Sequence, residues 1–327
     1  MKNLLNSIQS PVVNQIHASA RYLFWLLAVA LVLCTASCSE SDGVGGELNI
    51  DPKLSQAVFD NPEEPAILLA KALKDADPEL INQLFGADYR EVLPLDTVVQ
   101  EDIDNYLNAW DKFHALVPQG EGKVLIAIGE NEWTLPIPIT KGTSGWYFDI
   151  DEGLERMRIR RIGRNELATM QVVLAYYDAQ MEYAQQDRNG NGFLEYAQKF
   201  ISTPGTTDGL FWENDEGETV SPLGPLLADE SNEDGYHGYH YRILHAQGDS
   251  AKGGAYSYML GDNMRAGFAL VAWPAEYGES GVMSFIVSHS GIVYEQNLGP
   301  EGAEVAQAMT SYNPEEGWTP AKEVNGP

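Results

Sequence analysis

The sequence predicts an α+β protein in which helical segments precede antiparallel sheets in each of two successive domains. In the first half of the chain, two runs with helical periodicity come before three short strand-like runs. In the second half, one long helical run comes before four strand-like runs. Gly-containing turns separate the strand-like runs, and the length of 327 residues agrees with two domains of ordinary size.

The helical segments of the first half have their apolar residues on one face. The first segment begins at Asn61 and Pro62, residue types that are typical of a helix start. The second extends roughly over residues 97–117. The apolar face of the first segment contains Ile67, Leu68, Ala72 and Leu73.

Three strand-like runs follow: "KVLIAIG", "EWTLPIPIT" and "GWYFDI". Pro136 and Pro138 place the middle run at an edge or a bulge, because proline cannot donate to a sheet ladder. Helices followed by an antiparallel sheet are similar in element order to the cystatin-like or nuclear-transport-factor-like cone. That resemblance implies a fold that hosts both binding proteins and enzymes.

A long helical run covers residues 152–187. We expect it to break near Gly163, with Asn165 as the N-cap of a new helix, and we place the domain boundary there. The new helix has one apolar stripe, which predicts its buried face. The stripe contains Leu167, Met170, Leu174, Tyr177 and Met181.

Four short strands are expected after this helix, in "YHYRILHAQ", "AGFALVAWP", "VMSFIVS" and "GIVYEQN". A long helix followed by an antiparallel sheet resembles the globular part of type IV pilins and type II secretion pseudopilins. The resemblance implies a pilin-like second domain.

The N-terminus reads as a secretory signal. Lys2 and Arg21 precede a short apolar run from Tyr22 to Cys34, and the small residues of "TASC" follow it, ending at Cys38. The run is too short to favour a permanent membrane span. Its end resembles the lipobox of bacterial lipoproteins, which implies lipidation of Cys38, and Ser39 is similar to an outer-membrane sorting signal.

The expected organisation begins with this signal and a flexible Gly-, Ser- and acid-rich tether. Two domains and a short tail follow. The expected segments are a signal peptide 1–37, a tether 38–56, a cystatin-like domain 57–160, a pilin-like domain 161–318 and a tail 319–327.

The composition limits the classes of partner. The formal net charge is −28, and removal of Lys2 and Arg21 with the signal makes it two units more negative. Phosphate binding needs clustered cations, so the charge excludes nucleic acid as a partner. With Cys34 in the signal and Cys38 lipidated, no thiol remains for a disulfide or a cysteine nucleophile.

Several longer motifs carry a family resemblance. They include "IPITKGTSGWYFD", "YAQQDRNGNGFLEYAQKFISTPGTTDGLFW", "YHGYHYRIL" and "AGFALVAWPAEYGESGVMSFIV". These motifs resemble the bacterial domain of unknown function 2950 family, from about Pro62 to Trp318. The family has no established activity, so the resemblance implies no catalytic residues.

The stretch "DRNGNGFLE" has the ligand spacing of an EF-hand calcium loop. Gln198 occupies the twelfth position, where a bidentate Glu is typical, so we expect weak Ca²⁺ binding at best. The alternative is an Asn/Gly-rich turn between two helices. The candidate ligands are Asp187, Asn189, Asn191, the Phe193 carbonyl and Glu195.

Two further groups of residues are candidate ligand sites. A cluster of arginines either binds an external anion, such as a lipid or glycan phosphate, or pairs with acidic residues of its own chain. A group of aromatic residues forms either a glycan platform or part of the core. The arginines are Arg156, Arg158, Arg160, Arg161 and Arg164, and the aromatic residues are Tyr239, Tyr241, Tyr256, Tyr258 and Trp273.

Together these features predict a lipid-anchored protein of the cell envelope that faces the periplasm. Its expected role is a non-enzymatic binding or assembly component, with a glycan or an envelope protein as partner. The alternative is an envelope hydrolase acting on a glycan or peptide, with Glu276 or the histidines in its site.

Overall fold

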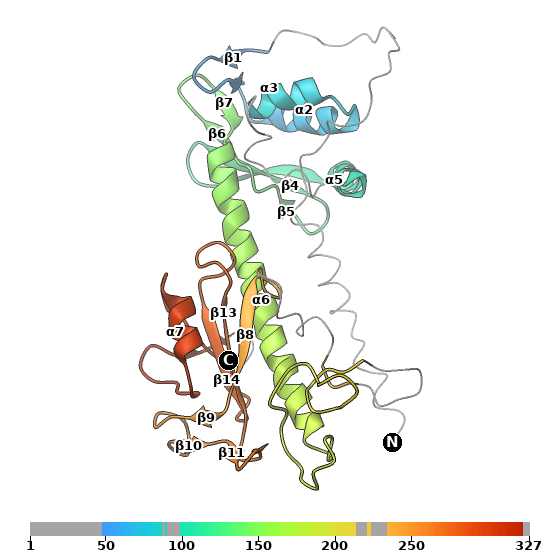
Figure 1. Ribbon diagram of the computed structural model, residues 1–327. Coiled ribbons are helices and arrows are strands. Elements are labelled where there is room, and N and C mark those ends of the chain that lie inside the picture. The colour runs from blue at the N-terminus through green and yellow to red at the C-terminus, as the bar shows by residue number, and fades with distance from the viewer. Residues whose placement is uncertain (1–47, 87–88, 90–98, 214–220, 224–233, 323–327) are drawn as a thin grey trace. The chain divides into compact units, whose positions relative to one another are not determined.

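The computed structural model describes residues 48–86, 89, 99–213, 221–223 and 234–322. The described residues form two compact units, one ending at Arg158 and the other beginning at Ile159. Each unit combines helix with antiparallel sheet (Figure 1), which confirms the predicted α+β class. The expected signal peptide and Cys38 lie outside the described residues. Within them, no helix is both long enough and apolar enough to cross a membrane.

The first unit opens with a hairpin of β1 (Ile50–Asp51) and β2 (Gln56–Ala57), which pair antiparallel. Gln56 and Ala57 are buried, and the Gln56 side chain donates a hydrogen bond to the Phe148 carbonyl at 2.8 Å. The last residues of the expected tether, 50–56, thus include this hairpin, of which β1 and its turn are largely exposed and Gln56 is buried.

The segment predicted as the first helix forms two helices, α2 (Glu63–Lys74) and α3 (Pro78–Phe85). Asp77 separates them: its carboxylate accepts hydrogen bonds from the N–H groups of Glu79 and Leu80. Pro78 then occupies the first turn of α3, where a missing N–H costs nothing. An N-cap followed by proline therefore divides the apolar pattern into two helices.

Helix α5 (Gln100–Lys112) is shorter than predicted, because residues 114–117 of the expected helix belong to β3 (His114–Pro118). β3 pairs antiparallel with β4 (Lys123–Ile128) over five positions. Phe113, between helix and strand, has extended backbone with φ −161°. The turn from helix to strand thus takes a single residue.

The first sheet has the order β3-β4-β6-β7, with β5 (Trp133–Thr134) also pairing with β4. β6 is Ile139–Lys141 and β7 is Trp146–Phe148. The run containing two prolines is thus divided into β5 and β6, as expected where proline cannot donate. The core between helices and sheet includes Leu69, Leu73, Ile81, Leu84, Phe85, Ile126, Ile128, Ile139 and Phe148.

Helix α6 (Ile150–Tyr183) is continuous over 34 residues (Figure 1). The predicted break at Gly163 is wrong, and Asn165 is not an N-cap. An added Cβ at Gly163 would meet nothing within 4 Å, so this glycine fits an ordinary helical turn. The side chain of Asn165 instead donates to the Ser280 carbonyl at 2.8 Å.

The buried face of α6 also differs from the predicted stripe. Leu167 and Met181 are 52% and 42% exposed, whereas Thr169 and Gln180 are fully buried. The buried face could not be identified by counting apolar residues, because two of its buried positions carry polar side chains. The buried face contains Thr169, Met170, Val173, Tyr176, Gln180 and Tyr183.

The second sheet has the order β16-β15-β14-β13-β8, with every pair antiparallel. Its strands agree with the four predicted runs and add β16 (Thr319–Pro320), at the start of the expected tail. Two short antiparallel pairs, β9–β10 and β11–β12, lie between β8 and β13 in the sequence. The strands are β8 (Tyr239–Leu244), β9 (Ala246–Gln247), β10 (Tyr256–Ser257), β11 (Met259–Leu260), β12 (Asn263–Met264), β13 (Ala269–Pro274), β14 (Ser284–Ser288) and β15 (Tyr294–Gln296).

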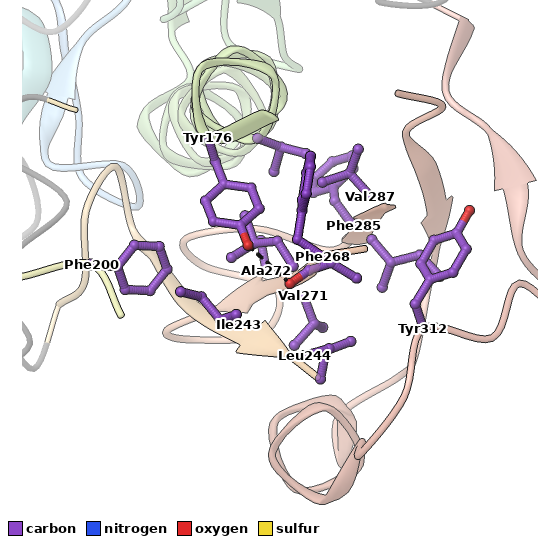
Figure 2. Close-up of a cluster of buried hydrophobic side chains, with 14 of the residues drawn as sticks. Tyr176, Phe200, Ile243, Leu244, Phe268, Val271, Ala272, Phe285, Val287 and Tyr312 are labelled. Carbon is purple, nitrogen blue, oxygen red and sulfur yellow. Dashed lines mark hydrogen bonds between the residues drawn. The ribbon is translucent and has the colours of Figure 1, made fainter. Parts of the chain in front are cut away.

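Helices cover both faces of this sheet. Tyr241 of β8 donates to Thr169 of α6 at 3.3 Å, whereas the next residue, Arg242, donates to the carbonyls of Ala306 and Met309 at 2.6 Å each. Successive strand residues point to opposite faces, so α6 lies on one face and α7 (Gly302–Ala308) on the other. Figure 2 shows the core, with labelled residues that include Phe268, Val271, Phe285 and Val287.

Candidate functional site

The loop from Asp187 to Glu195 follows the C-terminal end of α6 and is closed by the Asp187 carboxylate. Oδ1 of Asp187 accepts a hydrogen bond from the Asn191 N–H at 3.1 Å, and Oδ2 accepts one from the Gly192 N–H at 2.9 Å. Gly190 and Gly192 have φ of 72° and 88°, a backbone conformation that favours glycine. The two glycines thus allow the loop to wrap around its own side chains.

Three side chains of the loop meet at the Glu195 carboxylate. The side-chain amides of Asn189 and Asn191 both donate to Glu195 Oε1, Asn191 at 3.0 Å. Glu195 is only 5% exposed, although most of the loop is exposed. Among the described residues, Glu195 Oε2 has no hydrogen-bond partner. A buried carboxylate oxygen without a partner lowers the stability of the folded state, so Glu195 is a candidate for binding a ligand.

The exit of the loop is fixed to the core of the second unit. Gln180 of α6 donates to the Ala197 carbonyl and accepts from the Ala197 N–H, both at 2.8 Å. Tyr196 N–H donates to the Met264 carbonyl of β12, also at 2.8 Å. The two residues that follow Glu195 are therefore fixed, Tyr196 to β12 and Ala197 to α6, and they hold Glu195 in position.

The nearest arginines interact with other groups. The Arg188 side chain is 6% exposed; its guanidinium lies 5.5 Å from the centroid of the Trp212 ring and 3.9 Å from the Glu182 carboxylate. Arg265 lies over the Phe193 ring at 4.6 Å. Arg188 Nε, like Glu195 Oε2, is buried and has no hydrogen-bond partner among the described residues.

The loop lies in a field of negative charge. Burial raises the pKa of the Tyr183 hydroxyl, the carboxylates of Glu195, Asp208 and Asp187 raise it further, and the positive charge of Arg188 lowers it. The hydroxyl donates to the Thr207 carbonyl at 3.1 Å. Tyr183 therefore stays a neutral donor that ties the end of α6 to the chain around Asp208.

Gln198, the twelfth position of the expected loop, is not turned to the loop centre. Its side-chain amide donates to the Asp262 carbonyl at 2.7 Å. In the described part of the chain, no three His, Cys, Asp or Glu side chains gather as a metal site. The loop itself supplies two carboxylates, and its other oxygens come from amides and a backbone carbonyl.

The arginine cluster interacts with its own chain. Arg160 and Arg164 each have an interaction within the structure as well. These contacts support the internal alternative rather than an external anion. Ion pairs join Arg156 to Glu152 at 2.9 Å, Arg158 to Glu155 at 2.7 Å, and Arg161 to Glu279.

The aromatic residues proposed as a platform are largely part of the core. Tyr239 and Tyr258 are fully buried and Trp273 is 6% exposed, so the prediction of a platform is wrong for these three. Tyr241 is half-buried and bonded to α6. Tyr256 is 36% exposed, and its hydroxyl lies 3.4 Å from His289 Nε2.

Glu166 is a structural residue that the sequence interpretation missed. Its Oε1 accepts hydrogen bonds from the N–H groups of Val282 and Met283, at 3.0 and 2.9 Å. With Asn165, it holds the turn before β14 against α6. The signal in the sequence is the polar pair Asn165 and Glu166 before the apolar stripe, of which Asn165 alone was considered, as an N-cap.

Glu276, one of the residues considered for a hydrolase, forms a turn with Ser280. Ser280 Oγ donates to the Glu276 carbonyl at 3.1 Å and accepts from the Glu276 N–H at 2.9 Å. The Glu276 side chain is exposed. The hydroxyl of Ser280 thus closes a turn, and Glu276 does not have the burial that adapts a carboxylate as a general base.

Comparison with known proteins places both units in one family. The model of the family described as "Protein of unknown function (DUF2950)" matches residues 56–321, and the chain belongs to that family. No curated protein and no solved structure matches the chain. The resemblance of the two units to cystatin-like and pilin-like domains stays a prediction.

Proposed function

We propose that this protein is a lipid-anchored component of the cell envelope, held at the periplasmic face of the outer membrane through Cys38. The supporting observation is the short apolar run with the small residues of "TASC" after it. A Gly-, Ser- and acid-rich segment follows Cys38. Its role is binding or assembly, with an envelope protein or a glycan as partner.

The geometry of the second unit supports binding over hydrolysis. Ser280 and Glu276 bond to each other to close an exposed turn, and the arginine cluster is used internally. The formal net charge of −28 gives the protein a strongly acidic character, which favours binding to partners with exposed positive charge.

The lipid anchor is tested by metabolic labelling with palmitate in a bacterial host. Cys38→Ser should abolish labelling and leave unprocessed precursor, because Cys38 is the cysteine that follows the small residues after the apolar run. Cys34→Ser is the matched control, and it should keep both labelling and processing. Labelling that persists in the Cys38→Ser protein would remove the basis of the proposal.

Binding and hydrolysis are separated with purified peptidoglycan. The purified protein should release no soluble muropeptides from the sacculi, and its sedimentation with them would identify the glycan as its partner. If the protein releases muropeptides, and a Glu276→Gln variant does not, the hydrolase alternative replaces the binding role.

A further inference from the structure

We propose that the loop Asp187–Glu195 is a calcium site of nine residues, closed by the buried carboxylate of Glu195. This inference is independent of the lipid anchor. Its ligands are side-chain oxygens of Asp187, Asn189 and Asn191, the Phe193 carbonyl, and both oxygens of Glu195.

Glu195 carries the argument. It is 95% buried, given its exposed fraction of 5%, and its Oε2 has no hydrogen-bond partner in the described part of the chain. A buried carboxylate needs a cation or a full set of donors. The guanidinium groups of Arg188 and Arg265 face aromatic rings instead. A bound cation would supply what Glu195 lacks.

The neighbouring amides can become ligands by a simple rotation. Asn189 and Asn191 now direct their NH₂ groups at Glu195 Oε1. A half-turn of each amide exchanges nitrogen for oxygen at the same position. Two amide oxygens would then face a carboxylate, an arrangement that requires a cation between them. The Asn191 N–H would keep Asp187 Oδ1 as its acceptor.

The site is largely formed before the ion binds. Asp187 already accepts two N–H groups of the loop, and the bonds of Tyr196 and Ala197 fix Glu195 from the other side. Pre-formed ligands lower the ordering cost of binding. Calcium therefore has to reorient amides but not to fold the loop.

Glu195 takes the closing role that Gln198 has in the twelve-residue interpretation. Gln198 is exposed, and its amide is bonded to the Asp262 carbonyl at 2.7 Å. The expectation that Gln198 limits the affinity is therefore replaced: Gln198 lies outside the ligand set. The structure thus points to a shorter loop with the bidentate residue at position nine.

The ligand chemistry selects calcium. All donors are oxygens, so soft metals that prefer sulfur or nitrogen are disfavoured. Asp187 and Glu195 together carry two negative charges, which match one divalent cation. Mg²⁺ requires a tight octahedral cage, whereas Ca²⁺ accepts six to eight oxygens at longer distances. With only two carboxylates, a Kd of about 0.1 to 1 mM is expected.

The test measures thermal unfolding and equilibrium dialysis with ⁴⁵Ca²⁺ on the protein lacking its signal. At roughly ten times the Kd, the Tm should rise by about 3 to 6 °C, because the ion binds the folded state alone. Dialysis should give one bound Ca²⁺ per chain. Mg²⁺ at the same concentration should leave the Tm nearly unchanged.

Three variants identify the ligands. Asp187→Asn keeps one of the two oxygens that close the turn and removes the negative charge, so it should lower the affinity at least about tenfold. Asn191→Asp removes an NH₂ donor from Glu195, so it should lower the Tm without calcium and enlarge the calcium-dependent rise. Glu195→Gln should abolish binding. The control is Asp178→Asn, an exposed carboxylate of α6 outside the loop, which should bind like the natural protein.

Two outcomes would overturn the proposal. One is a Tm and a dialysis result that do not respond to about 10 mM Ca²⁺ in either the natural protein or Asn191→Asp. The other is unchanged calcium binding in Asp187→Asn, since that variant retains the exposed turn and should fold. If Gln198→Ala lost binding in addition to this second outcome, the twelve-residue ligand set would replace the nine-residue one.

Discussion

Gln180 pairs with the backbone of Ala197 as a neighbouring strand would: its side-chain amide donates to the Ala197 carbonyl and accepts from the Ala197 N–H, both at 2.8 Å. Gln180 is fully buried and also donates to the Tyr176 hydroxyl at 3.0 Å. One amide group therefore satisfies the backbone of a loop segment inside the core.

Gln180→Ala should destabilise the protein by about 2 to 4 kcal/mol, because the N–H and carbonyl of Ala197 would lose their partners in a buried place. Urea denaturation followed by circular dichroism measures the change. Gln185→Ala, on the exposed side beyond the helix end, should change the free energy of unfolding by less than about 0.5 kcal/mol. Equal effects of the two changes would contradict this role for Gln180.

Gly163→Ala should stabilise the protein by about 0.5 to 1 kcal/mol, since alanine is favoured over glycine inside a helix. The added Cβ would meet no atom within 4 Å. Thermal unfolding of the variant tests the continuity of α6. A loss of stability would indicate instead that the chain needs glycine at this point.

Gly281→Ala should destabilise by about 2 to 4 kcal/mol, because an added Cβ would lie 2.1 Å from the Tyr239 hydroxyl oxygen. The hydroxyl is fixed by its hydrogen bond to the Met283 carbonyl at 2.8 Å. Gly163→Ala, with the same added methyl group, is the matched control. Stability equal to that of the natural protein would show that the turn moves freely away from Tyr239.

Asp208→Asn tests the pH dependence of stability. Burial raises the pKa of the Asp208 carboxyl, but hydrogen bonds from Lys199, Thr203 and Thr206 outweigh burial and hold the pKa below its usual range. A depressed pKa stabilises the folded state above the unfolded pKa of about 3.9, and this contribution is lost as the pH falls below that value.

The natural protein should therefore be more stable than Asp208→Asn at pH 7, and the difference should shrink below about pH 4. Guanidinium denaturation at several pH values measures it, with Asp178→Asn as the exposed control. A difference in stability that is independent of pH would show that the variant loses hydrogen-bond geometry, and that the charge of the Asp208 carboxylate does not matter.

The sequence predicted the elements whose patterns are local. The strands around Val271 and Ile286 are continuous apolar runs between turns, and they lie where they were expected. The buried face of α6 was not predictable from apolar residues, because Thr169 and Gln180 are buried through bonds to distant groups while Leu167 is exposed. Such bonds depend on tertiary partners that no local pattern contains.

The candidate site shows the same limit. The spacing of Asp187, Asn189 and Asn191 identified the loop, since alternate side chains turn inward in such loops. The role of Glu195 came from its burial and its unpartnered oxygen, and that of Gln198 from its bond to Asp262. Both depend on where residues far along the chain come to lie.

The hydrogen bonds that Glu166 accepts from Val282 and Met283 also predict an order of folding. These bonds join residues 116 and 117 positions apart, so they form only after the intervening chain has been gathered, at a high entropic cost. Helix α6 can propagate from local bonds before that. Glu166→Ala should therefore speed unfolding in stopped-flow measurements while leaving the folding rate nearly unchanged, as expected for contacts made after the rate-limiting barrier.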